Sequence, residues 1–107
     1  MPDFDEILKM AQNAQNELQK TQDGLDKIEV EGVSGGGLVR IRCSAKGRVI
    51  AVNVDETLLQ PMEKTMLEDL IAAAINDART KADQKGAEEM AKMTSSLPLP
   101  PGFKLPF

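Results

Sequence analysis

The spacing of the apolar residues changes twice along this chain, and that change limits the folds open to it. Over residues 1–28 the apolar residues recur at alternating steps of three and four, which is the spacing of one helix face. Over residues 28–54 they recur at every second position, which is the period of a β-strand. From about residue 62 the helical spacing returns. The chain is therefore expected to place a strand region between two long helices.

The first helix is predicted over about residues 3–27. Its apolar stripe keeps a heptad spacing with one polar interruption: Phe4, Ile7, Ala11, Ala14, Leu18, Thr21, Leu25 and Ile28. Carboxylates in its first turn suit the positive end of the helix dipole. Its exposed faces are rich in neutral amides, namely Gln12, Asn13, Gln15, Asn16, Gln19 and Gln22.

Three strands are predicted between the helices. Alternating apolar residues mark them: Ile28 and Val30, then Val39, Ile41 and Cys43, then Ile50, Val52 and Val54. Residues 32–37 and 45–47 are expected to form turns, so the simplest product is a three-stranded antiparallel meander. The glycine run at 35–37 lacks the spacing and the following helix of a phosphate-binding loop, which favours a hairpin connection. Cys43 alternates with apolar residues and is predicted to be a small buried core residue.

A second long helix is predicted over about residues 62–93, ended by residues 94–96. Its apolar face consists of Leu67, Leu70, Ile71, Ala74, Ala78 and Ala82. The following segment, residues 97–107 (LPLPPGFKLPF), is too rich in proline for a helix. This tail is either a polyproline ligand for a partner or a strap that docks Leu97, Phe103 and Phe107 on the protein's own surface. We expect one domain over residues 1–96 and a separate C-terminal tail.

This order of elements defines an α+β fold, α-β-β-β-α, whose helices are longer than its sheet. The two helices would extend roughly 40 Å, whereas strands of this size span only about 20 Å. The helices must therefore overhang the sheet, and a three-stranded sheet keeps two open edges. Symmetric pairing of two copies would resolve both problems, so we expect a homodimer.

The composition excludes most enzyme chemistry. The 107 residues include no histidine and one cysteine, so the chain has no imidazole base and no common set of zinc ligands. Glu68 and Asp69 point about 100° apart on a helix and cannot work as a catalytic carboxylate pair. We expect no catalytic residues, cofactor, metal or small-molecule substrate. The longest apolar stretch, Leu70–Ile75, is too short to span a membrane, and a single thiol suits a reducing cytoplasm.

The chain is acidic, and its positive charge is concentrated in the strand region. The net charge is −4, yet residues 29–54 carry four basic and two acidic side chains. Arg40 and Arg42 point to one side of their strand, where a solvated face is the commoner interpretation and a nucleic-acid patch the alternative. The apolar face of the second helix continues as a basic stripe of Lys81, Lys85 and Lys92. These lysines either lie beside the core or form a positive inner surface, and the pattern leaves both open.

Four segments of the chain carry a resemblance to a known family. They are Gly35–Val39 (GGGLV), Val54-Asp55 with Leu58-Leu59, Met66–Ala78 (MLEDLIAAAINDA) and Leu99–Phe107 (LPPGFKLPF). In this order the chain resembles the YbaB/EbfC family of bacterial nucleoid-associated proteins. The family fold is an α-β-β-β-α dimer with helices that project like tweezers. The resemblance implies a homodimer in the cytoplasmic nucleoid that binds double-stranded DNA, alters its conformation and bears on nucleoid organisation and gene expression.

The resemblance also implies that the projecting ends of the helices contact DNA. The basic residues expected there are Lys9, Arg79, Lys81, Lys85 and Lys92, with Arg40 and Arg42 on the sheet as the alternative surface. An isoelectric point near 4.8 predicts few phosphate contacts and much reliance on DNA shape. Three phenylalanines offer no stacking platform, which favours duplex over single-stranded DNA. The alternative function is a protein-interaction module that acts through the tail or a helical face.

Overall fold

The structure, a computed structural model, describes residues 3–96 and has the predicted α-β-β-β-α order. The main elements are α1 (Phe4–Leu25), β1 (Glu29–Ser34), β2 (Val39–Ser44), β3 (Val49–Val54) and α2 (Lys64–Ser96). Short 3₁₀ turns occupy Gly35–Gly37, Glu56–Leu58 and Pro61–Glu63. The molecule is elongated, with extents of 70 × 20 × 16 Å. The proline-rich tail predicted at 97–107 lies outside the described residues.

The helix ends differ from the predicted ones for local reasons. α1 begins after Asp3, whose carboxylate accepts a hydrogen bond from the Glu6 backbone N–H at 2.8 Å. The second helix was expected over about residues 62–93, and α2 extends three residues further, through Ser96. The Thr94 and Ser95 hydroxyls donate to the carbonyls of Met90 and Lys92, so they satisfy themselves within the helix rather than ending it.

The sheet is the predicted antiparallel meander with the strand order β1-β2-β3. Val39 of β2 pairs with Ser34 of β1 and with Val54 of β3, and an irregularity interrupts the β2–β3 register between Arg42 and Cys43. The glycine run connects β1 to β2 with positive φ angles at all three glycines, which confirms a hairpin connection. The turn predicted from residue 32 is wrong at its start, because β1 continues to Ser34.

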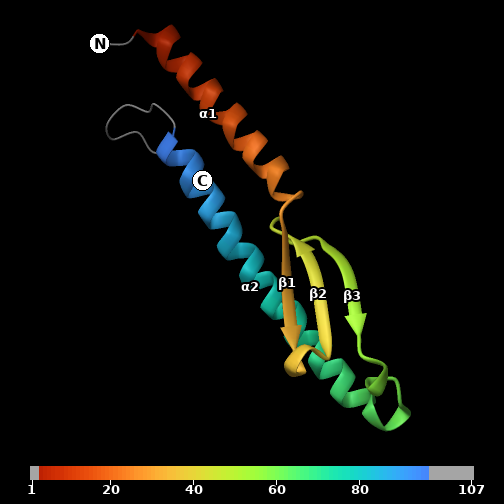
Figure 1. The fold of residues 1–107 in the computed structure, drawn as a ribbon. Helices are drawn as coiled ribbons and strands as arrows, with labels where there is room; N and C mark the ends of the chain where they lie inside the picture. Colours follow the sequence, from red (N-terminus) through yellow and green to blue (C-terminus); the bar gives the residue numbers. More distant parts are fainter. Residues whose placement is uncertain (1–2, 97–107) are drawn as a thin grey trace.

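The core lies between α2 and the first two strands, since α2 runs across β1 and β2 (Figure 1). Its buried side chains are Val39, Ile41 and Cys43 from β2, Ala74, Ala78 and Ala82 from α2, and Leu58. Small residues on α2 allow the helix to approach the sheet closely. Cys43 is 1% exposed, which confirms its predicted place in the core, and its Sγ lies 3.6 Å from the Ala78 carbonyl oxygen.

Beyond the sheet, α1 and the last part of α2 run side by side as a two-helix arm (Figure 1). The base of this arm is at Gly86, where a Cβ atom would lie 3.6 Å from the Ala45 carbonyl and 3.8 Å from Leu25 Cδ1. The end of α1, the β2–β3 turn and α2 therefore meet at one point. The Ala45 N–H also donates to the Ile28 carbonyl at 2.8 Å, which joins the turn to the segment that follows α1.

Candidate nucleic-acid interface

The sheet arginines lie on the outer face of the sheet, away from α2, and each is held by a carboxylate of β1. Arg40 Nη1 lies 2.9 Å from Glu31 Oε1, and Arg42 Nη1 lies 3.3 Å from Glu29 Oε2. Both pairs run diagonally between neighbouring strands, where opposite charges favour strand pairing. Their positive charge is therefore largely neutralised locally, as expected of a solvated sheet face.

Two of the basic residues predicted for the projecting helix ends lie instead beside the sheet. Lys81 Nζ is 2.9 Å from the Glu31 carbonyl and 3.0 Å from Asp77 Oδ2, so it binds the edge of β1. Arg79 follows Ala78, which is buried against the sheet, and its own side chain is exposed. The periodicity of α2 could not reveal this, because only the fold shows where α2 leaves the sheet. Their contact with DNA stays a prediction.

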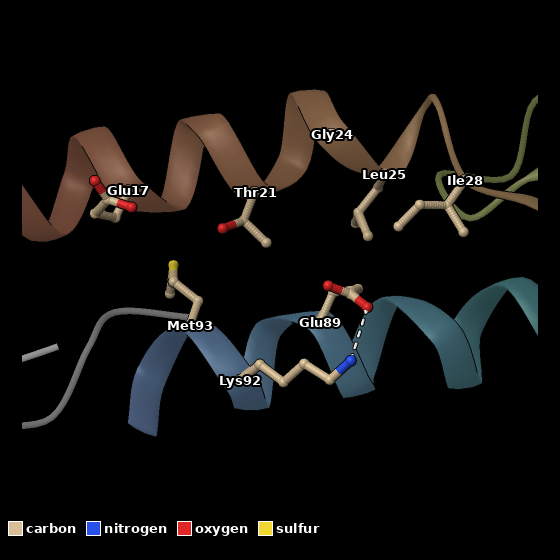
Figure 2. A pocket seen from close by; sticks show the side chains of 8 residues that line it. All are labelled: Glu17, Thr21, Gly24, Leu25, Ile28, Glu89, Lys92 and Met93. Atoms are coloured by element: carbon tan, nitrogen blue, oxygen red, sulfur yellow. Dashed lines mark hydrogen bonds and ion pairs between the residues drawn. The ribbon is translucent and has the colours of Figure 1, made fainter. Parts of the chain in front are cut away.

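The other two lysines of the basic stripe lie near or on the arm and have acidic neighbours. Lys85 Nζ is 3.7 Å from carboxylate oxygens of both Glu88 and Glu89, and Lys92 Nζ is 3.3 Å from Glu89. Lys92 borders a cleft of about 480 Å³ between the helices, with Glu89 ion-paired to it (Figure 2). The lining residues are Glu17, Thr21, Gly24, Leu25, Ile28, Glu89, Lys92 and Met93. The cleft therefore holds two carboxylates against one lysine.

The arm as a whole is acidic. Residues 3–25 and 86–96 contain three lysines and seven carboxylates. Lys9 is the arm lysine nearest the start of α1; it is exposed and forms no ion pair within the described part of the chain. An acidic arm repels phosphate at long range, so the arm lysines alone make a weak site for DNA.

The base of the arm carries a denser group of cations, Lys27, Lys46 and Arg48, here called the arm-base cluster. Lys27 precedes Ile28 and Lys46 follows Ala45, and these two neighbours share a backbone hydrogen bond of 2.8 Å. Both lysines are exposed, and neither forms an ion pair within residues 3–96. Neither lysine is among the DNA contacts predicted from the sequence. The basic balance of residues 29–54 could have indicated Lys46, whereas Lys27 lies outside that segment and had no such signal.

Arg48 is the paired member of the arm-base cluster. Its Nε and Nη2 lie 3.0 and 3.4 Å from the two carboxylate oxygens of Asp26, at the end of α1. The Arg48 hydrogen bond is the main cause that lowers the pKa of Asp26, and the nearby positive charge of Lys46 also contributes. The pair fixes the β2–β3 turn to the end of α1 and so holds the cluster together.

The two edges of the sheet differ in their hydrogen bonds to side chains. On β1, the Val33 N–H donates to Asp77 at 2.9 Å and the Glu31 carbonyl accepts from Lys81, so side chains of α2 occupy this edge. Among the described residues, no side chain forms a hydrogen bond with the outer edge of β3. Large apolar side chains on β3 and the segment after it are between 49% and 87% exposed: Val49, Val52, Leu59, Met62 and Met66. We call these five residues the β3 patch.

The fold and its surfaces define a slender α+β protein with a small meander and a two-helix arm. The chain belongs to the YbaB/EbfC DNA-binding family, whose sequence pattern matches residues 1–97. That membership confirms the resemblance and assigns the chain a nucleoid-associated, DNA-binding role. No enzymatic activity is known for the family.

A solved structure supports the same fold. The crystal structure of the uncharacterized protein HP0035 from Helicobacter pylori aligns with a TM-score of 0.76 and 18% identity. The alignment covers 88% of this chain and 99% of that one. In the described part of the chain, neither α1 nor α2 is long and apolar enough to cross a membrane.

Proposed function

We propose that this protein binds duplex DNA as a homodimer, alters the conformation of the DNA and thereby acts in nucleoid organisation and gene expression. The observation that carries the proposal is the family match over residues 1–97. The site of action is then the nucleoid, in the cytoplasm. The open edge of β3, the β3 patch and the exposed lysines support a proposal for the dimer interface and for the DNA contacts.

The second copy is proposed to bind at β3. Asp77 and Lys81 occupy the outer edge of β1, which leaves the edge of β3 to accept another strand. The β3 patch adds apolar side chains beside that edge, and contiguous exposed apolar surface of this kind marks protein interfaces. A two-fold axis at β3 would bury the patch of both chains in one isologous contact.

The phosphate contacts are proposed to come from Lys27 and Lys46 of each protomer. Affinity for DNA rests on cations that replace the counterions of phosphates. A lysine that already holds a carboxylate must give up that pair first, as Lys85 and Lys92 would, whereas Lys27 and Lys46 need not. Lys9 and Arg79 also lack an ion pair among the described residues, and they form the second candidate set.

This assignment predicts a shallow dependence of binding on salt. Four phosphate contacts per dimer, two from each protomer, give a slope of log affinity against log salt of about −3.6, at about 0.9 for each contact. With so few phosphate contacts, any preference for one DNA duplex over another must come from DNA shape and deformability. A protein that selects a bent or narrowed duplex in this way also stabilises that conformation.

The test compares two charge-reversed variants by gel-shift titration with duplex DNA over a series of salt concentrations. Lys27→Glu with Lys46→Glu changes the arm base, and Lys9→Glu with Lys92→Glu applies the same charge change to the arm. We expect the first variant to lose binding and the second to keep most of it. Circular dichroism and sedimentation check that each variant keeps its helicity and its mass.

The opposite result would move the phosphate contacts to the arm, where the resemblance first placed them. If both variants bind as the unchanged protein does, neither Lys27 and Lys46 nor Lys9 and Lys92 contact phosphate. If the unchanged protein fails to bind duplex DNA at low salt, the proposed function itself is wrong.

A further inference from the structure

The N-terminal part of α1 extends beyond its helical partner. Leu25 lies beside Gly86, and the two helices run in opposite directions with the same rise per residue. Ten residues along α2 from Gly86 to Ser96 therefore match ten residues back along α1, from Leu25 to Gln15. Within residues 3–96, no α2 residue lies opposite the part of α1 before Gln15, and this part overhangs the last drawn turn of α2 in Figure 1.

This overhang continues the apolar stripe of α1, and the stripe is exposed over the first turns of the helix. Ala14 and Leu25 are the buried residues of the stripe, and Leu25 lies beside Gly86 of α2. Towards the start of the helix, seven and ten residues before Ala14, Ile7 and Phe4 are 44% and 73% exposed, and Leu8 beside them is 46% exposed. Exposed apolar side chains that lie together in this way mark a surface to which another segment or chain binds.

We propose that the chain's own tail, residues 97–107, folds back along α1 and covers this part of the stripe. The tail starts directly after Ser96, the point at which α1 loses its partner. Eleven extended residues reach about 36 Å, whereas α1 from Gln15 to Phe4 spans only about 16 Å. The tail is thus long enough to pass the whole overhang.

The chemistry of the two segments is complementary. The tail contains five large apolar side chains within eleven residues: Leu97, Leu99, Phe103, Leu105 and Phe107. Its one charged side chain is Lys104, whereas the first turn of α1 and its cap carry Asp3, Asp5 and Glu6. The tail prolines restrict the free segment to extended conformations, which lowers the entropy lost on docking. This proposal does not depend on DNA binding.

The chain offers a clean spectroscopic test, because all three of its aromatic residues, Phe4, Phe103 and Phe107, belong to the proposed contact. In the full-length protein with NMR-visible phenylalanine rings, we expect cross-relaxation between the tail rings and the methyl groups of Ile7 and Leu8. A sample mixed from differently labelled chains separates contacts within one chain from contacts between chains. Contacts found only between chains would overturn the proposal in favour of a second copy as the occupant. Tail rings with random-coil shifts and no such contact would also overturn it.

Matched variants on α1 test which helix face holds the tail. Ile7→Ala removes a contact on the stripe, and Gln12→Ala removes an exposed side chain roughly 140° around the same helix. We expect Ile7→Ala to shift the resonances of Phe103 and Phe107 towards random-coil values and Gln12→Ala to leave them unchanged. Equal effects would refute docking on the stripe.

A variant of the tail tests the same contact from the other side, because its substitutions lie outside the helices and strands of the domain. Phe103→Ala with Phe107→Ala should lose most of the hydrogen-exchange protection of the α1 amides before Gln15, relative to the unchanged protein. Unchanged protection would count against the proposal.

Discussion

At the scale of single residues, the packing of α2 on the sheet depends on a position where no side chain fits. A Cβ atom on Gly32 of β1 would collide with the carbonyl oxygen of Ala74 and with the backbone nitrogen and Cβ of Ala78. The glycine therefore sets how closely strand and helix approach. The same close approach buries Cys43, whose thiol pKa is raised by that burial.

Gly32→Ala is expected to destabilise the protein by about 1–3 kcal/mol, because the new methyl group must push α2 away from β1. Urea denaturation at a fixed protein concentration measures the loss. Gly24→Ala is the matched control, since open space surrounds Gly24 in α1 and the change should instead add about 0.5–1 kcal/mol. Equal stability of the two variants would contradict the close packing of β1 against α2.

Cys43 is expected to react slowly with a disulfide reagent in the native protein. Its side chain is almost fully covered, and its raised pKa leaves little thiolate at neutral pH. The release of the coloured thiol, followed with and without denaturing urea, gives the two rates. A native rate equal to the unfolded rate would mean that the thiol is accessible.

At the scale of the elements, α2 both covers the sheet and closes one of its edges. The Asp77 carboxylate accepts a hydrogen bond from the backbone N–H of Val33, which is the main cause of its lowered pKa, and the hydrogen bond from Lys81 adds to it. A strand edge protected by charged side chains of a neighbouring helix cannot easily recruit another strand.

Asp77 should make the stability of the fold depend on pH in the acid range. Its pKa is lower in the folded state, so its contribution is present above the ordinary carboxyl pKa of about 3.9 and is lost as the pH falls through the folded value. Asp77→Asn should therefore cost more stability at pH 7 than at pH 2.5, as measured by urea denaturation. An equal cost at both values would show that the charge of Asp77 contributes nothing.

The elements were largely predictable, because their apolar periods are long and regular. The errors have two causes, tertiary packing at Gly32 and side-chain hydrogen bonds within α2 at Thr94 and Ser95. Gly32 is a residue type that indicates a turn, yet it lies in β1 with α2 packed against it. The hydroxyls of Thr94 and Ser95 donate to carbonyls of the preceding turn of α2. The candidate site was less predictable. The partners of Arg40 and Arg42 lie on β1 and depend on the strand register, which the sequence pattern does not contain.

At the scale of the whole molecule, the edge of β3 and the apolar surface beside it are available for a second chain. The open edge of β3 and the β3 patch lie on consecutive parts of the chain, from Val49 to Met66. Burial of large apolar side chains on both sides of a two-fold axis is the usual basis of a stable homodimer.

We expect the protein to sediment at twice its chain mass of 11.6 kDa. Val52→Asp with Met62→Asp should shift the mass to that of one chain, because the change places two charges in the proposed interface. Val33→Asp is the control, since Val33 is a partly exposed valine of β1, on the face of the sheet away from α2. A dimer that survives the first variant would place the interface elsewhere.

The unbroken course of α2 has a mechanical consequence. Its 33 residues form one rod about 50 Å long, which begins beside the β3 patch and ends on the arm. The rod acts as a lever whose fulcrum is the sheet. The far end lies about 21 Å beyond Ala82, the last α2 residue buried on the sheet, so a rotation of about 5° about the sheet displaces it by roughly 2 Å. In the proposed dimer, substitutions at β3 would therefore change the position of the arms, and with it DNA binding, without altering a residue that contacts DNA.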